Sequence, residues 1–301
     1  MSESIKITMF TALANLIVSI AKILAGWLGN SMAVLTDGVH SFSDFATDLV
    51  LIIGLKISDK PADKKYQYGY KRMENIISFS IGAGLIAVGT FFLLKNSLIL
   101  YNFIFNKIYP YYEVSYLAGI VAFITFLIKF GLYRYNYYFG KKLNNQGILS
   151  NSYENKSDAI SSLGIAAGTL IVSILGAKYS IIDSILSLVI SLFIIHFAIS
   201  IIVTNFQIIL GIGSPSKTIK EIEDCVLSDC DIIDVHNIRT RYEGENLFID
   251  MHITVNKDIS VQKGHDIAAK TEKQIKEKID NVKDVVIHLE PSSIGKENCK
   301  E

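Results

Sequence analysis

The sequence predicts a membrane α-helical protein, with six transmembrane helices followed by a small cytoplasmic α+β domain. Half of its 301 residues are hydrophobic and only 19% are charged, a composition too apolar for an ordinary soluble protein. The charged residues are sparse over residues 1–210 and dense from Lys217 onward, which indicates two parts in different solvents. We therefore expect a transmembrane domain over residues 1–210 and a water-soluble domain over residues 211–301.

Six segments are long and apolar enough to cross a bilayer, which takes about 20 helical residues. They are residues 8–28, 34–57, 75–100, 114–135, 159–177 and 180–205. The first segment lacks the small-residue cleavage site of a signal peptide, so we expect it to be retained as a span.

The loops between these spans differ in positive charge. The second-to-third and fourth-to-fifth connections are the basic ones; they contain Lys60, Lys64, Lys65, Lys71 and Arg72, and Arg134, Lys141 and Lys142, respectively. Basic loops stay on the cytoplasmic side, so both termini are expected in the cytoplasm, in a plasma or inner membrane.

The soluble part shows the periodicities of a small globular domain. Ser216 is the expected N-cap of a first helix, and 262–279 is amphipathic with helical spacing. Residues 245–256 alternate as in a strand, with Leu247, Ile249, Met251, Ile253 and Val255 on one face. A second alternation over 285–290 predicts the last strand. The order helix, strand, strand, helix, strand indicates helices packed on one face of a small sheet.

The second span carries polar residues that an apolar helix does not need. Asp37, His40, Asp44 and Asp48 recur at spacings of three and four and share one face. Burying such groups without partners costs at least a few kcal/mol each, so this face must line water, bind an ion or meet opposite charge. The alternative is a polar helix end or a structural hydrogen-bond network. This alternative applies more to Asp37 and Asp48 than to His40 and Asp44.

The fifth span repeats this pattern with Glu154 and Asp158 at i and i+4. Two helices that each present two ligands can close a four-ligand site, a geometry that zinc favours and that manganese and iron accept. Paired carboxylates without metal would instead suit a proton relay. His40 favours metal.

Four motifs follow one another along the chain: Thr36–Asp44, Pro61–Asp63 with Tyr68–Tyr70, Ser157–Ser162, and His236–Arg241. Together they resemble the cation diffusion facilitator family, the proton-coupled exporters of divalent metals. The resemblance covers nearly the whole chain. It implies a homodimer with a transport site between the second and fifth spans, and metallochaperone-like C-terminal domains that pair in the cytoplasm.

The resemblance places the transport ligands on His40, Asp44, Glu154 and Asp158. Glu154 departs from the family pattern, which commonly has His or Asp there. One imidazole and three carboxylates lean towards harder ions such as manganese or ferrous iron, although zinc also accepts carboxylates.

The loop between the second and third spans departs more strongly. Where some relatives have an aspartate and two histidines, this sequence has Asp63, Tyr66 and Tyr70. Tyrosine, with a pKa near 10, is a poor ligand for these ions at neutral pH. We expect the loop site to be missing, and Asp63 to be a solvated charge or the partner of a nearby lysine.

The soluble domain keeps more of the family's metal positions. Four of the six histidines lie in this domain, which favours metal binding over chance placement. The matching residues are His236, Asp250, His252, His265, His288 and Glu290. His196 in the sixth span is instead interpreted as a packed interior histidine.

These features predict a divalent metal exporter that exchanges manganese, iron or zinc for protons by alternating access. Metal and protons compete for the same ligands, so exchange needs no ATP, and the nucleotide-binding pattern GxxxxGK[ST] is absent from the sequence. We expect no permanent cofactor, no nucleic-acid partner and no enzymatic activity, because a closed four-ligand site leaves no position for a substrate. A membrane-anchored metal sensor without transport is the alternative.

Overall fold

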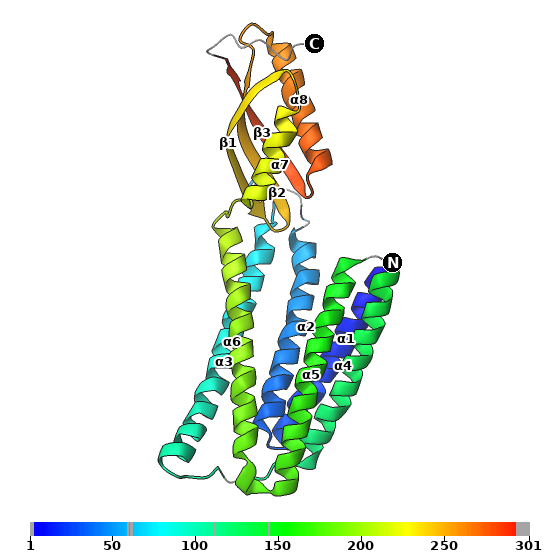
Figure 1. The fold of residues 1–301 in the computed structure, drawn as a ribbon, viewed down its shortest axis with the longest axis vertical. Coiled ribbons are helices and arrows are strands. Elements are labelled where there is room, and N and C mark those ends of the chain that lie inside the picture. The colour runs from blue at the N-terminus through cyan, green and yellow to red at the C-terminus, as the bar shows by residue number, and fades with distance from the viewer. Residues whose placement is uncertain (1–2, 59, 61–62, 111, 144, 293–301) are drawn as a thin grey trace. The chain divides into compact units, whose positions relative to one another are not determined.

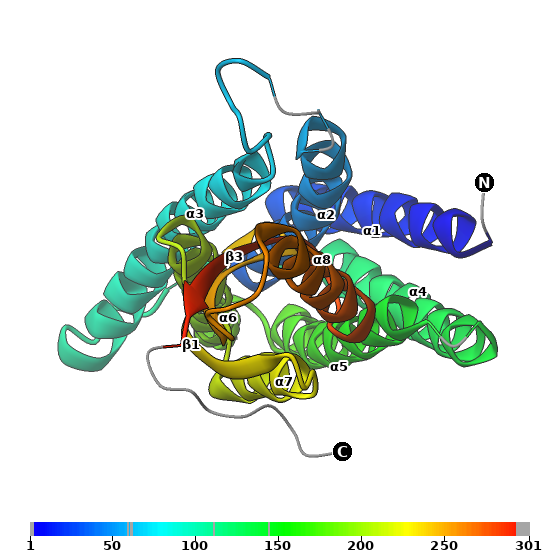
Figure 2. The ribbon, with the colours of Figure 1, turned by 90° about the horizontal axis from the view of Figure 1, so that it is seen from above.

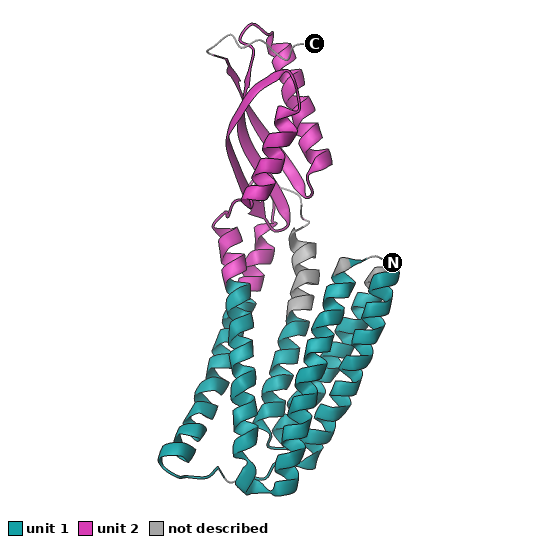
Figure 3. Ribbon diagram, in the orientation of Figure 1, with its two compact units in different colours: residues 1–53, 80–202 teal, residues 54–79, 203–301 magenta. Residues whose placement is uncertain are grey.

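The structure is a computed structural model that describes residues 3–58, 60, 63–110, 112–143 and 145–292. The chain divides into two compact units, residues 1–53 with 80–202 and residues 54–79 with 203–301 (Figure 3). The ends of three long helices thus belong to the second unit, together with the soluble domain.

The six predicted spans are confirmed as six long helices in the described part of the chain (Figure 1). They are α1 (Glu3–Leu28), α2 (Met32–Ser58), α3 (Arg72–Phe105), α4 (Tyr116–Lys142), α5 (Gln146–Leu175) and α6 (Ile181–Ile209). Over the described residues, all but α2 are long and apolar enough by composition alone to cross a membrane. The helix α2 carries the polar face that the sequence singled out.

The fifth helix begins earlier than the hydropathy predicts. Its N-cap is Asn145, whose side chain accepts a hydrogen bond from the backbone of Ile148. The polar turns before residue 159 are therefore helical, and Glu154 and Asp158 lie well inside α5. Hydropathy missed them because it measures apolar content rather than capping.

Close helix packing organises the first unit. The helices α4 and α5 lie side by side in both views, with α1 against α4 (Figures 1 and 2). At Gly119 of α4 a Cβ atom would lie 2.6 Å from the Leu170 side chain of α5, so any larger residue would force that side chain or the helix to shift. Small residues let membrane helices approach closely, which is the main source of their attraction in lipid.

Asp183 at the start of α6 fixes the first turn of α2. Its carboxylate is buried and accepts hydrogen bonds from the Ser31 hydroxyl at 2.6 Å and from the backbone of Met32 at 2.7 Å. A carboxylate at a helix start satisfies backbone donors that otherwise lack partners. The helix that carries His40 and Asp44 is therefore held at its beginning by α6.

The soluble domain has the predicted order of elements. They are α7 (Ser216–Leu227), β1 (Ile232–Glu243), β2 (Asn246–Val255), α8 (Val261–Lys278) and β3 (Val282–Pro291). The central strand β2 pairs antiparallel with β1 and parallel with β3. The prediction of Ser216 as N-cap is wrong by one residue, because Pro215 holds that position and its carbonyl accepts the hydrogen bond of Ile219.

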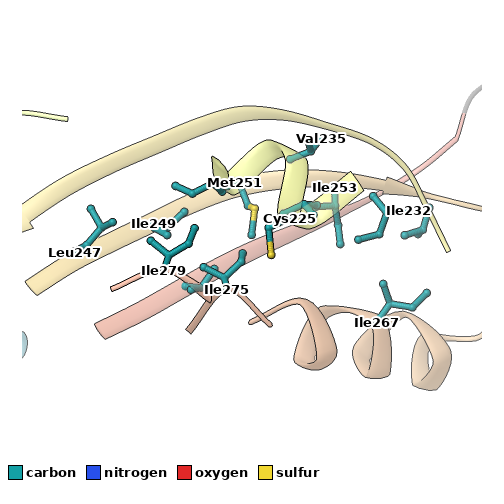
Figure 4. Close-up of a cluster of buried hydrophobic side chains, with 14 residues drawn as sticks. Cys225, Ile232, Val235, Leu247, Ile249, Met251, Ile253, Ile267, Ile275 and Ile279 are labelled. Carbon is teal, nitrogen blue, oxygen red and sulfur yellow. The ribbon is translucent and has the colours of Figure 1, made fainter. Parts of the chain in front are cut away.

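One face of the sheet forms the core of this domain. Ile249, Met251 and Ile253 of β2 are at most 1% exposed and lie among Ile275 and other apolar residues of the two helices (Figure 4). The predicted alternation of β2 is thus confirmed, and His252 lies on the opposite, open face of the sheet.

Replacement of a core residue should destabilise the soluble domain. We expect Ile253→Ala to lower the free energy of unfolding of a fragment spanning residues 212–295 by about 2–5 kcal/mol, because it leaves a cavity. Val286 is 57% exposed, so Val286→Ala should change it by less than about 0.5 kcal/mol. Urea unfolding followed by circular dichroism measures both, and equal effects would contradict the assigned faces.

Candidate functional site

Three of the four residues predicted for the transport site come together in the first unit. One ligand atom each from His40, Asp44 and Asp158 lies within 4.8 Å of the others. The first two follow each other by one turn on α2, and the third comes from α5. The geometry can hold a cation with one nitrogen and two carboxylate groups.

These side chains are poorly satisfied by the protein itself. Among the described residues, His40 Nδ1 and Asp44 Oδ2 are buried and have no hydrogen-bond partner. The distance from His40 Nδ1 to the other carboxylate oxygen, Asp44 Oδ1, is 3.9 Å, which is too long for a hydrogen bond. Buried polar atoms in native proteins are nearly always paired, so these orphaned atoms fit a site that binds a cation.

Glu154 is the predicted ligand that the structure does not bring into this group. It lies on α5 one turn before Asp158, and its side chain is exposed. The described group therefore differs from the expected four-ligand set. Helical spacing alone shows that two residues share a face, but not how far each reaches towards a neighbouring helix.

The structure describes the environment of only one of the two aspartates, Asp37 and Asp48, that flank the His40–Asp44 pair on α2. Asp37 is 2.7 Å from the ammonium group of Lys22 on α1, and both side chains are at most 3% exposed. It thus meets an opposite charge, one of the three roles expected for this face. The side chain of Asp48 lies outside the described residues.

Two buried lysines were missed in the sequence. Besides Lys22, the ammonium group of Lys129 on α4 lies 2.7 Å from Asp158 Oδ2, and the lysine side chain is 1% exposed. A charged residue inside an apolar span is itself a signal of function or pairing. That signal was present for both lysines, but their partners lie on other helices.

In the soluble domain, three histidines lie side by side on the open face of the sheet. His236, His252 and His288 are partners in register across β1, β2 and β3. A bulge follows His236, with Asn237 in the left-handed region at φ 51°, and such bulges re-aim neighbouring side chains. A small pocket of about 110 Å³ adjoins His252 and His288.

Glu290 completes this second group. Its carboxylate lies 2.8 Å from His252 Nδ1 and 3.2 Å from His236 Nε2, and these three residues offer ligand atoms within 4.8 Å of one another. The hydrogen bond with His252 and the nearby imidazoles lower the pKa of Glu290 below its usual value. The arrangement is half-buried and accessible from solvent.

The other residues predicted for this domain are placed elsewhere. Asp250 lies on the same face as His252 but pairs with Arg241 at 3.2 Å. His265 is exposed on α8, an element outside the described group. His288 lies at the edge, 3.9 Å from Glu290.

The loop before α3 carries a hydrogen-bonded cluster of tyrosine and aspartate. Asp63 accepts a hydrogen bond from the Tyr70 hydroxyl at 2.6 Å and two more from the backbone of Lys65 and Tyr66. The Tyr70 hydrogen bond, followed by the backbone ones, lowers the pKa of Asp63. Of the two roles expected for Asp63, the exposed carboxylate fits that of a solvated charge, and its side-chain partner is Tyr70 rather than a lysine.

Comparison with known proteins gives two family matches that together span most of the chain. Residues 8–210 match the cation efflux transmembrane domain, and residues 214–292 match the cation efflux protein cytoplasmic domain. An uncharacterized transporter of Methanocaldococcus jannaschii is 31% identical over 96% of this chain and 99% of its own length. The manganese efflux system protein MneP of Bacillus subtilis is 28% identical over 95% of each chain. The metal-bound C-terminal domain of the CzcD transporter from Thermotoga maritima is 27% identical with a TM-score of 0.24, over 27% of this chain and all of that domain.

The contact between His252 and Glu290 makes a prediction about ionisation. In the metal-free fragment of residues 212–295, we expect His252→Ala to raise the pKa of Glu290 towards about 4.3, its ordinary value. The pKa of Glu290 is lower in the folded state than in the unfolded state. The contact therefore stabilises the fold fully at pH values above the unfolded pKa, and this stabilisation is lost as the pH falls through the folded pKa. Carboxyl carbon NMR measures this pKa. Lys273→Gln on the exposed face of α8 is the control, and a shift of equal size there would contradict the assignment.

Proposed function

Because the chain belongs to the cation diffusion facilitator family, whose members are metal cation efflux transporters and not enzymes, we propose that it exports a divalent metal ion in exchange for protons. The proposal rests on the group of His40, Asp44 and Asp158 between two membrane helices. This group unites a metal-ligand set with a location where uncompensated charge is costly.

Competition for shared ligands supplies the coupling. A carboxylate or an imidazole must lose its proton before it binds metal, so protons arriving from one side displace the metal there. If α2 and α5 alternately expose the group to the cytoplasm and to the outside, metal leaves as protons enter. The basic loops support an orientation with both termini in the cytoplasm. We place the protein in a plasma or inner membrane.

Manganese or ferrous iron is our proposed substrate in preference to zinc. Two carboxylates and one imidazole form an oxygen-rich donor set, and hard oxygen ligands suit these ions better than they suit thiolate-seeking metals. The Bacillus subtilis relative is named as a manganese efflux protein, which agrees with this choice. Zinc remains an acceptable ion for such ligands.

We assign the cytoplasmic group a regulatory role. His236, His252 and Glu290 offer a nitrogen-rich site whose exposure lets it exchange metal with the cytoplasm. Pairing of two such domains in a homodimer would let metal occupancy act on the membrane helices. A metal sensor without transport is the less favoured function, because it gives no reason for a ligand group inside the bundle.

Removal of a membrane ligand should separate transport from cytoplasmic binding. We expect Asp44→Ala to reduce metal-driven proton flux in proteoliposomes by at least about 100-fold, since replacement of even an outer partner of a metal ligand costs 10–100-fold. The variant should remain a folded dimer on size-exclusion chromatography and still bind metal through its soluble domain. Asp63→Ala, in the exposed loop, is the control. Unchanged flux in Asp44→Ala would rule out the proposed transport site.

The cytoplasmic group should bind metal by itself. We expect the fragment of residues 212–295 to bind manganese or zinc in calorimetry, and the affinity to fall as the pH approaches the histidine pKa near 6.5. His252→Ala with His288→Ala should weaken binding at least about tenfold, whereas Glu277→Ala on exposed α8 should not. Binding that ignores both the pH and the histidines would refute the regulatory site.

A further inference from the structure

The two lysines buried among the membrane helices are held in different ways. The ammonium group of Lys22 meets three oxygens, from Asp37 at 2.7 Å, Ser162 at 2.9 Å and Ser41 at 3.1 Å. An ammonium group has three donors, so Lys22 is fully satisfied. Such a group has a structural role and no reason to move.

Lys129 has fewer hydrogen-bond partners than Lys22. Within the described parts of the chain, its hydrogen-bond partner is the carboxylate of Asp158 at 2.7 Å. Its other two donors have no protein acceptor among the described residues, and its side chain is 1% exposed. Asp158 in turn offers a ligand atom within 4.8 Å of ligand atoms of His40 and Asp44. This lysine is thus a buried cation placed at the edge of the ligand group.

Charge counting shows what Lys129 does to this group. Asp44 and Asp158 without metal carry two negative charges, and the lysine cancels one of them. A divalent metal added to the same three residues would leave an excess positive charge inside the bundle. Bound metal and the Lys129–Asp158 pair therefore oppose each other, because like charges a few ångströms apart repel strongly in an apolar environment.

We propose that Lys129 is a tethered cation that holds Asp158 while no metal is bound and releases it when metal arrives. The proposal rests on the transport site described above. In the empty carrier the lysine keeps Asp158 paired, so the closed, metal-free protein does not leave the Asp158 carboxylate uncompensated. The metal and the lysine thus bind the Asp158 carboxylate alternately.

Glu154 supplies the second resting place of the lysine. It lies one turn before Asp158 on α5, about 6 Å along the helix axis, which puts a second carboxylate on the helix that carries the first partner of Lys129. With Glu154 included, three carboxylates, one lysine and one divalent metal are together neutral. This gives Glu154 a role that does not require it to be a direct ligand.

The test measures manganese binding and manganese movement in the full-length protein. All proteins carry His236→Ala, His252→Ala and His288→Ala, which removes every histidine of the cytoplasmic group, so that binding reports on the membrane site. Equilibrium dialysis gives the affinity. Proteoliposomes give two rates with radioactive manganese, net uptake into metal-free vesicles and exchange with vesicles preloaded with manganese.

Removal of the Lys129 charge and a stronger hold on Asp158 should have opposite effects on manganese affinity. Lys129→Gln should bind manganese at least tenfold more tightly and keep exchange, but lose most net uptake, because the empty carrier cannot close around an unpaired Asp158. Lys129→Arg should bind at least threefold more weakly, since a guanidinium holds a carboxylate by two hydrogen bonds. The exposed Lys156→Gln on α5 is the control and should match the wild type.

Several results would overturn this role for Lys129. Affinity unchanged or weakened in Lys129→Gln, or exchange lost together with net uptake, would make the lysine a structural partner. If that variant does not yield folded protein, Lys129→Arg decides alone, and unchanged or tighter binding there overturns the proposal.

A double-variant cycle tests the transfer to Glu154. Glu154→Gln should weaken manganese binding in the presence of Lys129 and change it by less than twofold in Lys129→Gln, because the displaced lysine is then absent. Equal losses in both backgrounds would make Glu154 a direct ligand and overturn the transfer.

Asp44→Asn separates failure of this inference from failure of the proposed function. If it leaves binding and uptake unchanged, the transport site itself is wrong. If it removes both while the Lys129 variants behave like the wild type, the transport site stands and the tethered cation does not.

Discussion

The constraint on which the membrane unit depends is that an ionised side chain inside it needs a partner. Water is scarce among apolar helices, so each buried carboxylate must meet a lysine, a hydrogen-bond donor or an ion. Asp37 meets Lys22 and Asp183 meets the start of α2. The group of His40 and Asp44 is where the protein leaves such needs unmet.

The ligand group lies where helices meet rather than within one helix. The helix α2 contributes two groups and α5 a third, while α4 brings the competing charge of Lys129. A relative movement of these helices changes the distances within the group and the exposure of its members. The chemistry of the site and the conformation of the bundle are therefore linked through the same few contacts.

The soluble domain obeys a different constraint, since its histidine group faces water and carries no large desolvation cost. There the sheet positions the ligands. Strand register places His236, His252 and His288 in one row, and Glu290 lies beside them. By contrast, the loop cluster of Asp63 and Tyr70 satisfies its carboxylate with a phenol and backbone groups, which leaves it less need for a metal.

The sequence by itself determined the six helices, the order of elements in the soluble domain and the polar face of α2. These features follow from local periodicity and hydropathy, which each segment carries independently of the rest. The identity of His40, Asp44 and Asp158 as candidate ligands was available in the same way. So was the open face of β2 on which His252 lies.

Only the tertiary structure decided which of these residues meet. It paired Lys22 with Asp37 and Lys129 with Asp158, kept Glu154 out of the described group, and turned Asp250 towards Arg241. It also aligned the histidines of three strands, of which β3 is separated from β1 and β2 by the helix α8. The physical reason is that a sequence pattern shows which face of an element is polar, whereas the pairing of charges depends on distances between elements, which the packing of the whole unit sets.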